Sequence, residues 1–214
     1  MNKLTAVFLV ASSLTLGCSS HSETVGDGKL KTENRPITDF SSLIISGEYQ
    51  VKWLSGQPAL NIITDQNLLP QITSTVNGNA LTITGEKNIS PTDGIIITVS
   101  SASLNDIHIS GASSLSANKL SGTDLKLEAG DTSSINVDGA VTNVEAVLEG
   151  ASILDAKALK TQSFKVSMKG TANAEVNVSE KLIANISQVA TMIYTGTPKL
   201  VEKNISGLGK MESK

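Results

Sequence analysis

The feature that most constrains this chain is a unit that recurs about every 20 residues in its second half. Four copies occupy residues 109–115, 128–135, 148–154 and 168–174, and their glycines are separated by 19, 20 and 20 residues. Two weaker copies follow at 187–193, where Val189 replaces the glycine, and at 205–211, and an upstream relative lies at 45–51. These copies predict structural turn positions at Gly47, Gly111, Gly130, Gly150, Gly170 and Gly207.

A fixed period of this length, with strand-like residues on both sides of each turn and no helical segment between, predicts a solenoid. Glycine suits a corner that needs a positive φ or leaves no room for a side chain. We therefore expect an all-β protein: a parallel β-helix or closely related β-solenoid over residues 104–214, led by an irregular β-segment over 35–103. A β-sandwich whose turns are evenly spaced by coincidence is the alternative.

The first half alternates apolar and polar residues with period 2, and it is rich in β-branched side chains. That pattern predicts strands at residues 43–45, 49–53, 60–63, 72–76, 80–84 and 95–99. The segment from Asn77 to Asn79 predicts a hairpin. One helical turn is expected from Asp65 to Leu69, where Pro70 would end it.

The repeat also predicts which side chains face inward and how the stack ends. The apolar residue four places after each turn position should be buried, which applies to Leu115, Leu154, Ile193 and Met211. The last 17 residues begin with Pro198, which interrupts a strand, and carry several charges. We expect them to form a cap that shields the open edge of the final coil.

The recurrent Ser-Gly-Ala-Ser units, the segment Tyr194-Thr195-Gly196-Thr197-Pro198 and the closing Ser206-Gly207-Leu208-Gly209 resemble one bacterial family. This is the "putative auto-transporter adhesin, head GIN domain" family, and the similarity covers roughly residues 39–211. The resemblance implies a β-helix-like solenoid led by a more irregular β-segment. It carries no particular activity over to this chain. Members of the family carry repeated Gly-Ser-Gly-Asp units. In this chain the second glycine of the unit is replaced by Ala112, Ala151 or Thr171, and the Asp is kept only as Asp131.

The first 17 residues read as an export signal, because Lys3 precedes an uncharged run of 13 residues, which is too short to span a bilayer as a helix. Gly17 directly before Cys18 resembles a bacterial lipobox, which implies lipidation of Cys18 and cleavage before it. Ser19 after the cysteine implies the outer membrane of a Gram-negative cell. Ordinary secretory cleavage is the alternative. Residues 18–34 would then be the lipidated cysteine and a flexible tether, because residues 19–34 contain few apolar side chains.

Composition excludes several classes of function. The chain has 17 basic and 20 acidic residues with no basic cluster, so we expect no nucleic-acid partner. Its single cysteine rules out a disulfide framework, and two histidines leave little for a metal centre. We expect no cofactor and no metal site, and we read His108 as an outward-facing strand residue.

The acidic residues of the repeats alternate with apolar ones as on a solvated strand face, and no column of three carboxylates recurs at the period. The acids concerned are Asp124, Glu128, Asp131, Asp138, Glu145, Glu149, Asp155 and Glu175. We therefore expect a non-enzymatic module of the cell envelope, held to the membrane by its lipid, that presents a stacked β-surface to a protein or glycan partner. Two alternatives stay open: an enzyme acting on polysaccharide, of the pectate-lyase type, and a periplasmic carrier or sensor of small hydrophobic ligands. The sequence predicts no catalytic residue, no specific binding residue and no oligomeric state.

Overall fold

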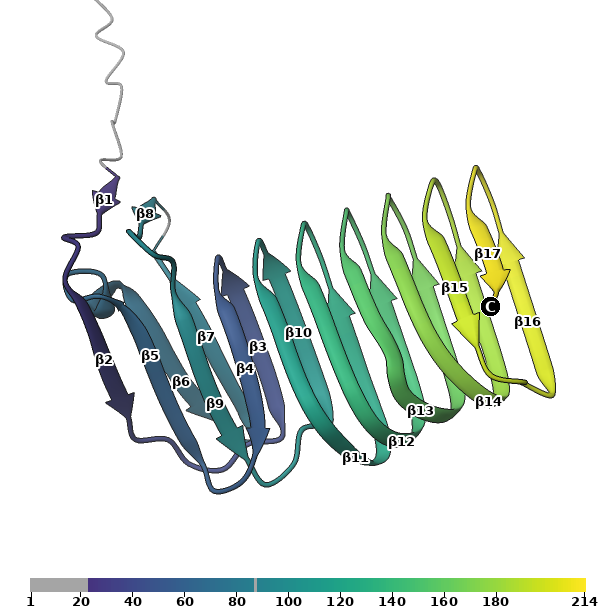
Figure 1. The fold of residues 1–214 in the computed structure, drawn as a ribbon, viewed down its shortest axis with the longest axis horizontal. Coiled ribbons are helices and arrows are strands. Elements are labelled where there is room, and N and C mark those ends of the chain that lie inside the picture. Colours follow the sequence, from purple (N-terminus) through teal and green to yellow (C-terminus); the bar gives the residue numbers. More distant parts are fainter. Residues whose placement is uncertain (1–22, 87) are drawn as a thin grey trace, which may run out of the picture.

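A computed structural model describes residues 23–86 and 88–214. The predicted export signal and the predicted lipidation site Cys18 lie outside these described residues. Within them the chain is almost entirely β-structure, wound into a flattened solenoid (Figure 1). No helix in the described ranges is long and apolar enough to cross a membrane. The predicted fold class, an all-β solenoid led by a more irregular β-segment, is confirmed.

Four long strands form the body of the solenoid, and each bends in the middle. They are β11 (Ser114–Ala129), β12 (Ser134–Leu148), β13 (Ile153–Met168) and β14 (Asn173–Ile186), paired in parallel with their neighbours. The register shifts at each bend, for example between Ala117 and Leu120 of β11. The two halves of each strand therefore run on opposite sides of the coil.

The pairing of the shorter strands defines two sheets. The first face contains the first halves of the long strands and continues through β4 (Gln50–Ser55), β9 (Ile96–Ser101), β5 (Ala59–Asp65) and β2 (Leu30–Arg35). The second face contains the second halves and continues through β10 (Asp106–Gly111), β3 (Ser42–Gly47), β7 (Ala80–Gly85) and β6 (Ile72–Asn77). Strands β6 and β7 form the predicted hairpin, with Gly78 at a φ of +61°.

The core fills the space between the two faces with rows of apolar side chains, one from each coil. Leu115 and Leu154 are buried as predicted and belong to one row with Ile135 and Met192, while Met211 is half-buried at the end of that row. The prediction for Ile193 is wrong, because the buried residue of that coil is Met192 and Ile193 lies on the outside. In a strand, a shift of one residue moves a side chain to the other face.

This error has its origin in the turns. Gly47, Gly111, Gly150, Gly170 and Gly207 all have positive φ, but Gly130 does not. In that copy of the repeat, the residue with positive φ is Asp131, at +56°. In the copy at residues 187–193, the residue with positive φ is Gln188, at +61°, and not Val189. Amide-to-carbonyl hydrogen bonds link this turn column from coil to coil, as from Ala151 to Asp131 at 2.7 Å.

The predicted tether is ordered over most of its described part, so that expectation needs correction. Strand β1 (Thr24–Val25) pairs with β8 (Ile89–Ser90), and β2 pairs antiparallel with β5. The sequence gives little sign of this, because β2 is a polar edge strand whose residues are mostly exposed. The helical turn is also displaced: residues 66–68 form a turn, and Pro70 lies inside the 3-10 helix η1 (Leu69–Gln71) rather than ending it.

The two ends of the solenoid differ. At the N-terminal end the guanidinium of Arg35 on β2 donates hydrogen bonds to the carbonyls of Leu69, at 2.8 Å, and Ile72, at 2.6 Å, and so links the edges of the two faces. At the C-terminal end, β15 (Thr191–Thr195), β16 (Leu200–Ile205) and β17 (Lys210–Ser213) continue the parallel stack. The predicted cap is therefore a further regular coil.

Candidate functional site

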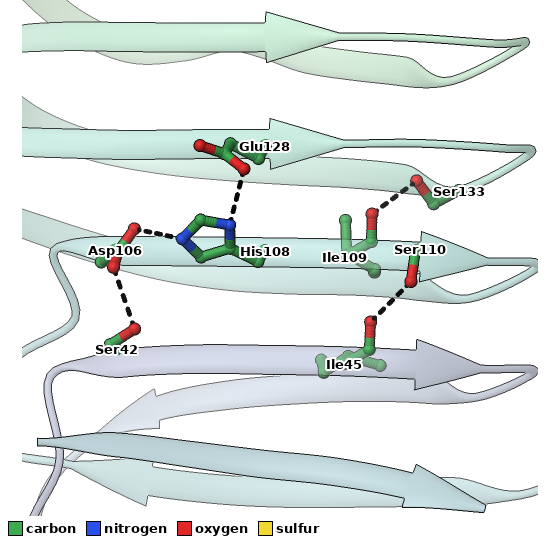
Figure 2. A network of polar contacts seen from close by, with 8 residues as sticks. All are labelled: Ser42, Ile45, Asp106, His108, Ile109, Ser110, Glu128 and Ser133. Carbon is green, nitrogen blue, oxygen red and sulfur yellow. Dashed lines mark hydrogen bonds and ion pairs between the residues drawn. The ribbon is translucent and has the colours of Figure 1, made fainter. Parts of the chain in front are cut away.

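The second face carries the most elaborate polar surface of the described residues, and its centre is His108 on β10. The ring of His108 lies between Asp106 on the same strand and Glu128 directly opposite on β11 (Figure 2). Its Nδ1 is 2.8 Å from Glu128 Oε2, and its Nε2 is 2.9 Å from Asp106 Oδ1. The Nδ1 contact is a hydrogen bond and the Nε2 contact is an ion-pair distance, so the ring links β10 to β11 through Glu128.

A serine completes this group without forming a nucleophilic triad. The hydroxyl of Ser42 donates to Asp106 Oδ2 at 3.0 Å, so the order of contacts is Ser42, Asp106, His108 (Figure 2). A serine nucleophile needs the histidine next to its own oxygen, with the carboxylate beyond it. Here the carboxylate stands between them, and the group joins three neighbouring strands instead of activating a hydroxyl.

Hydroxyls also join successive coils through the backbone close by. Ser110 donates to the carbonyl of Ile45 at 3.4 Å (Figure 2). The hydroxyl of Ser133 lies 2.7 Å from the carbonyl oxygen of Gly130 in its own turn and 3.3 Å from that of Ile109 in the preceding coil, and its single hydrogen is shared between the two. These bonds hold neighbouring coils in a fixed register. The side chains that such coils project therefore form straight rows.

One such row alternates in charge. Asp106, Lys126, Glu145 and Lys165 lie opposite one another on four successive strands. Opposite residues of paired strands are close neighbours, so like charges would repel one another and alternating charges attract. Lys165 Nζ is 2.8 Å from Glu145 Oε1, and the Lys165 hydrogen bond and charge, aided by the charge of Lys126, hold the pKa of Glu145 below its ordinary value.

This charged row borders a hollow of about 530 Å³ on the second face, which we call the polar hollow. Most of its lining residues carry an amide, carboxylate, hydroxyl or ammonium group: Asn79, Asn105, Asp106, Asp124, Lys126, Asn143, Glu145, Ser163 and Lys165. Leu125 and Val144 contribute apolar surface beside them. Such a surface offers many hydrogen-bond donors and acceptors in fixed rows. It can recognise a polar partner that lies flat across several coils.

Most acids of the repeats hold the coils together. Asp131 Oδ2 accepts a hydrogen bond from the Gly111 amide at 2.9 Å, and Asp138 Oδ1 accepts one from the Lys119 amide at 2.6 Å. Three more acids pair with the neighbouring coil: Asp124 with Asn143, Glu128 with His108 and Glu145 with Lys165. Asp155 instead pairs with Lys157 on its own strand, β13. In residues 23–86 and 88–214, no group of three or more His, Cys, Asp or Glu residues is placed to hold a metal ion.

Sequence reasoning missed the polar hollow and the role of His108 as a link between coils. The separate residues were visible, but only the register brings them side by side. Alternating charge at successive steps of about 20 residues, from Asp106 to Lys165, is the signal that could have indicated the row.

Among solved structures, the chain resembles a putative adhesin from Bacteroides fragilis, with a TM-score of 0.74 and 16% sequence identity, covering 89% of this chain and 99% of the other. It also resembles a putative adhesin from Parabacteroides distasonis, with a TM-score of 0.58, 18% identity and 90% and 100% coverage. A third structure, called a putative lipid binding protein and also from Parabacteroides distasonis, has a TM-score of 0.52, 18% identity and 90% and 100% coverage. At these identities, the likeness shows a common fold.

A comparison with curated proteins finds no match. A family model does match, over residues 39–198, which is most of the chain and includes both the irregular β-segment and the repeats. Its description is "Putative auto-transporter adhesin, head GIN domain", in agreement with the resemblance carried by the glycine units. The chain therefore belongs to the putative auto-transporter adhesin, head GIN domain family.

Proposed function

We propose that this protein is a non-enzymatic, adhesin-like binding module of the cell envelope, and that its second face binds a glycan or protein partner. The observation that carries the proposal is the polar hollow, where side chains of successive coils stand in rows fixed by the register. Family membership supports an adhesin-like role. A rigid surface with ready-made hydrogen-bonding groups loses little conformational entropy when it binds.

The arrangement of the polar groups favours binding over catalysis. His108 is engaged by two carboxylates, and Ser42 is bonded to Asp106 rather than to the ring. A hydrophobic carrier would need a cavity among its apolar side chains. The space between the two faces is instead filled by the rows of core residues.

We further propose that Cys18 is lipidated and anchors the protein in the outer membrane. Strand β1 begins at Thr24, so only residues 19–23 separate the cysteine from the ordered domain. Six residue steps span at most about 22 Å when fully extended. The N-terminal end of the solenoid would then lie close to the bilayer.

Membrane fractionation of cells that express the Cys18→Ser variant tests this anchor. We expect the variant to leave the membrane fraction and appear in the soluble fraction, whereas the wild type stays with the membrane. A variant that remains in the membrane fraction would show that Cys18 is not the anchor.

Binding is tested with beads that display the mature chain, applied to panels of immobilised glycans and envelope or matrix proteins. For any partner found, the double variant Lys126→Gln/Lys165→Gln should weaken binding at least tenfold. The control is Lys52→Gln, an exposed lysine of the first face, which should leave binding unchanged. Equal losses in both variants, or no binding to any member of the panels, would count against the proposed role of the second face.

A further inference from the structure

The charged row of the second face is complementary to itself when it is reversed. Read from β10 to β13, its charges are negative, positive, negative and positive. Read from β13 to β10, every position carries the opposite sign. A second copy of the chain whose stack of coils runs the other way would therefore place an acid opposite each lysine of the row and a lysine opposite each acid.

This reversal corresponds to a two-fold axis between two facing copies. The axis is parallel to the strands and passes between β11 and β12. Asp106 then lies opposite the partner's Lys165, and Lys126 lies opposite the partner's Glu145. Each pairing occurs twice, because a two-fold axis brings the same surface of both copies together. The row thus offers four ion pairs across a single symmetric interface.

The same axis passes through the middle of the whole face. From one end to the other, the second face has eight parallel strands in the order β7, β3, β10, β11, β12, β13, β14 and β16. Four of them lie on each side of the axis, so every strand meets a counterpart. At about 4.8 Å per strand and about 3.3 Å per residue over the 6 residues of β10, the face measures roughly 750 Å². This is comparable to the area of about 800 Å² per partner in a standard protein–protein interface.

The rows on either side of the charged row fit the same arrangement. In one of them, Glu128 would face the partner's Val147. In the other, Asp124 would face the amide of the partner's Asn143. The acids nearest the axis therefore meet an apolar or an amide side chain, and no acid faces another acid there.

Other arrangements of two facing copies bring like charges together. Moving the axis onto β12 would place Lys126 opposite the partner's Lys165 and Glu145 opposite its own counterpart. Stacks that run in the same direction would place every charge of the row opposite its own counterpart. Like charges repel across an interface, so the row selects one orientation and one register.

The ammonium group of Lys126 is available for such a contact. Its side chain is exposed, and it forms no ion pair with any residue that the structure describes. Exposed ion pairs add little affinity, so their main effect is to fix orientation and register. Three half-buried apolar side chains on the outside of the face supply contact that does not depend on charge: Ile44, Val147 and Ile183.

We propose that the partner of the second face is a second copy of this chain, bound face to face with its stack reversed. This inference rests on the proposed function, because it names the partner of the same surface. Strands β2 and β16 lie at opposite ends of the stack (Figure 1), so reversal places the two N-terminal ends at opposite ends of the pair. Copies attached by their N-termini to two facing surfaces would meet in this way and hold those surfaces together.

The test attaches the mature chain to beads through the thiol of Cys18, its only cysteine, which mimics an N-terminal anchor. We expect wild-type beads to cluster. Lys126→Glu places an acid opposite the partner's Glu145, and Glu145→Lys places a lysine opposite the partner's Lys126, so each variant alone should cluster at least tenfold less. Mixing beads of the two variants brings opposite charges together again and should restore clustering to within threefold of the wild type.

The double variant Lys126→Glu/Glu145→Lys keeps the net charge of the wild type. It should cluster with itself to within threefold of the wild type, but at least tenfold less with wild-type beads. Lys52→Glu makes the same change in net charge as Lys126→Glu on an exposed residue of the first face, and it should leave clustering within twofold. Circular dichroism shows whether each variant is folded, and if a single variant is not, the double variant decides the same question.

Three results would overturn the inference: wild-type beads that do not cluster, an equal loss for Lys52→Glu and Lys126→Glu, or folded variants that do not recover on mixing. A failure of this inference is distinguishable from a failure of the proposed function. If the beads do not cluster but the panels of glycans and proteins yield a partner that requires Lys126 and Lys165, the second face binds a partner other than its own copy.

Discussion

Gly170 offers the sharpest test of the turn column. It lies between β13 and β14 with a φ of +92°, and a β-carbon placed on it would lie 2.4 Å from the carbonyl oxygen of Gly150 in the preceding coil. An L-residue with left-handed backbone costs about 1–2 kcal/mol. A clash with backbone, which cannot rotate away, adds roughly 1–3 kcal/mol, as overpacking does. The two penalties act together in Gly170→Ala.

Alanine also lowers the conformational entropy of the unfolded chain, and this effect stabilises the folded protein by about 0.4–1 kcal/mol. The net expectation is that Gly170→Ala lowers the free energy of unfolding by about 1–5 kcal/mol. Urea denaturation followed by circular dichroism measures this loss. Hydrogen exchange should place it in β13 and β14, because each coil of a solenoid contacts only its neighbours.

The matched control is Gly130→Ala. Gly130 belongs to the same sequence unit, but it has no positive φ and nothing lies within 4 Å of a β-carbon built there. Its substitution should change stability by less than about 0.5 kcal/mol, or increase it slightly. A similar loss for both variants, or a loss below about 0.5 kcal/mol for Gly170→Ala, would refute this account of the turns.

Three further predictions concern buried and terminal polar groups. Ser152 Oγ is buried without a hydrogen bond to the described residues, so Ser152→Ala should leave the free energy of unfolding unchanged or raise it by up to about 1 kcal/mol. Ser133→Ala is the control: it removes a 2.7 Å hydrogen bond to the Gly130 carbonyl and should lower the free energy of unfolding by about 1 kcal/mol in the same denaturation assay. The pKa of Asp65 is lowered, chiefly by the Thr92 amide, so its contribution to stability is complete above the ordinary value of 3.8 and is lost as the pH falls through the lowered value. Wild type should therefore be more stable than Asp65→Asn at pH 7, and this advantage should shrink in acid; an advantage independent of pH would contradict the assignment. Lys203 lies on β16, the exposed edge strand of the second face, directly opposite buried Ala184. Lys203→Val should therefore promote self-association through that edge, and a monodisperse monomer in light scattering would show that the charge does not protect it.

The solenoid itself was predictable because every coil packs against its neighbours in the same way. Inward positions must be apolar in each coil, and a turn must follow at a constant distance, so the period is visible in the sequence. Leu115 and Leu154 could be assigned correctly from it. The exact turn residue was harder to assign, since Asp131 adopts a positive φ beside a glycine that does not. Asp tolerates this backbone better than most residues, but the neighbouring glycine is the more obvious candidate.

The edge strand and the polar surfaces could not be predicted in the same way. Strand β2 has no apolar face of its own, and its order comes from backbone pairing with β5 and from the contacts of Arg35. The polar hollow combines residues that are far apart in the sequence. Its existence depends on the register of successive coils, which no local motif encodes.

The register of successive coils is the central claim, because the turn column and the second face both depend on it. Disulfide cross-linking in a Cys18→Ser background tests it directly. Lys126 and Glu145 lie opposite each other in register, and cysteines at adjacent paired positions lie within disulfide range. The account predicts rapid cross-linking for Lys126→Cys/Glu145→Cys and none for the diagonal pair Lys126→Cys/Val147→Cys. Preferential cross-linking of the diagonal pair would contradict the register and the surfaces built on it.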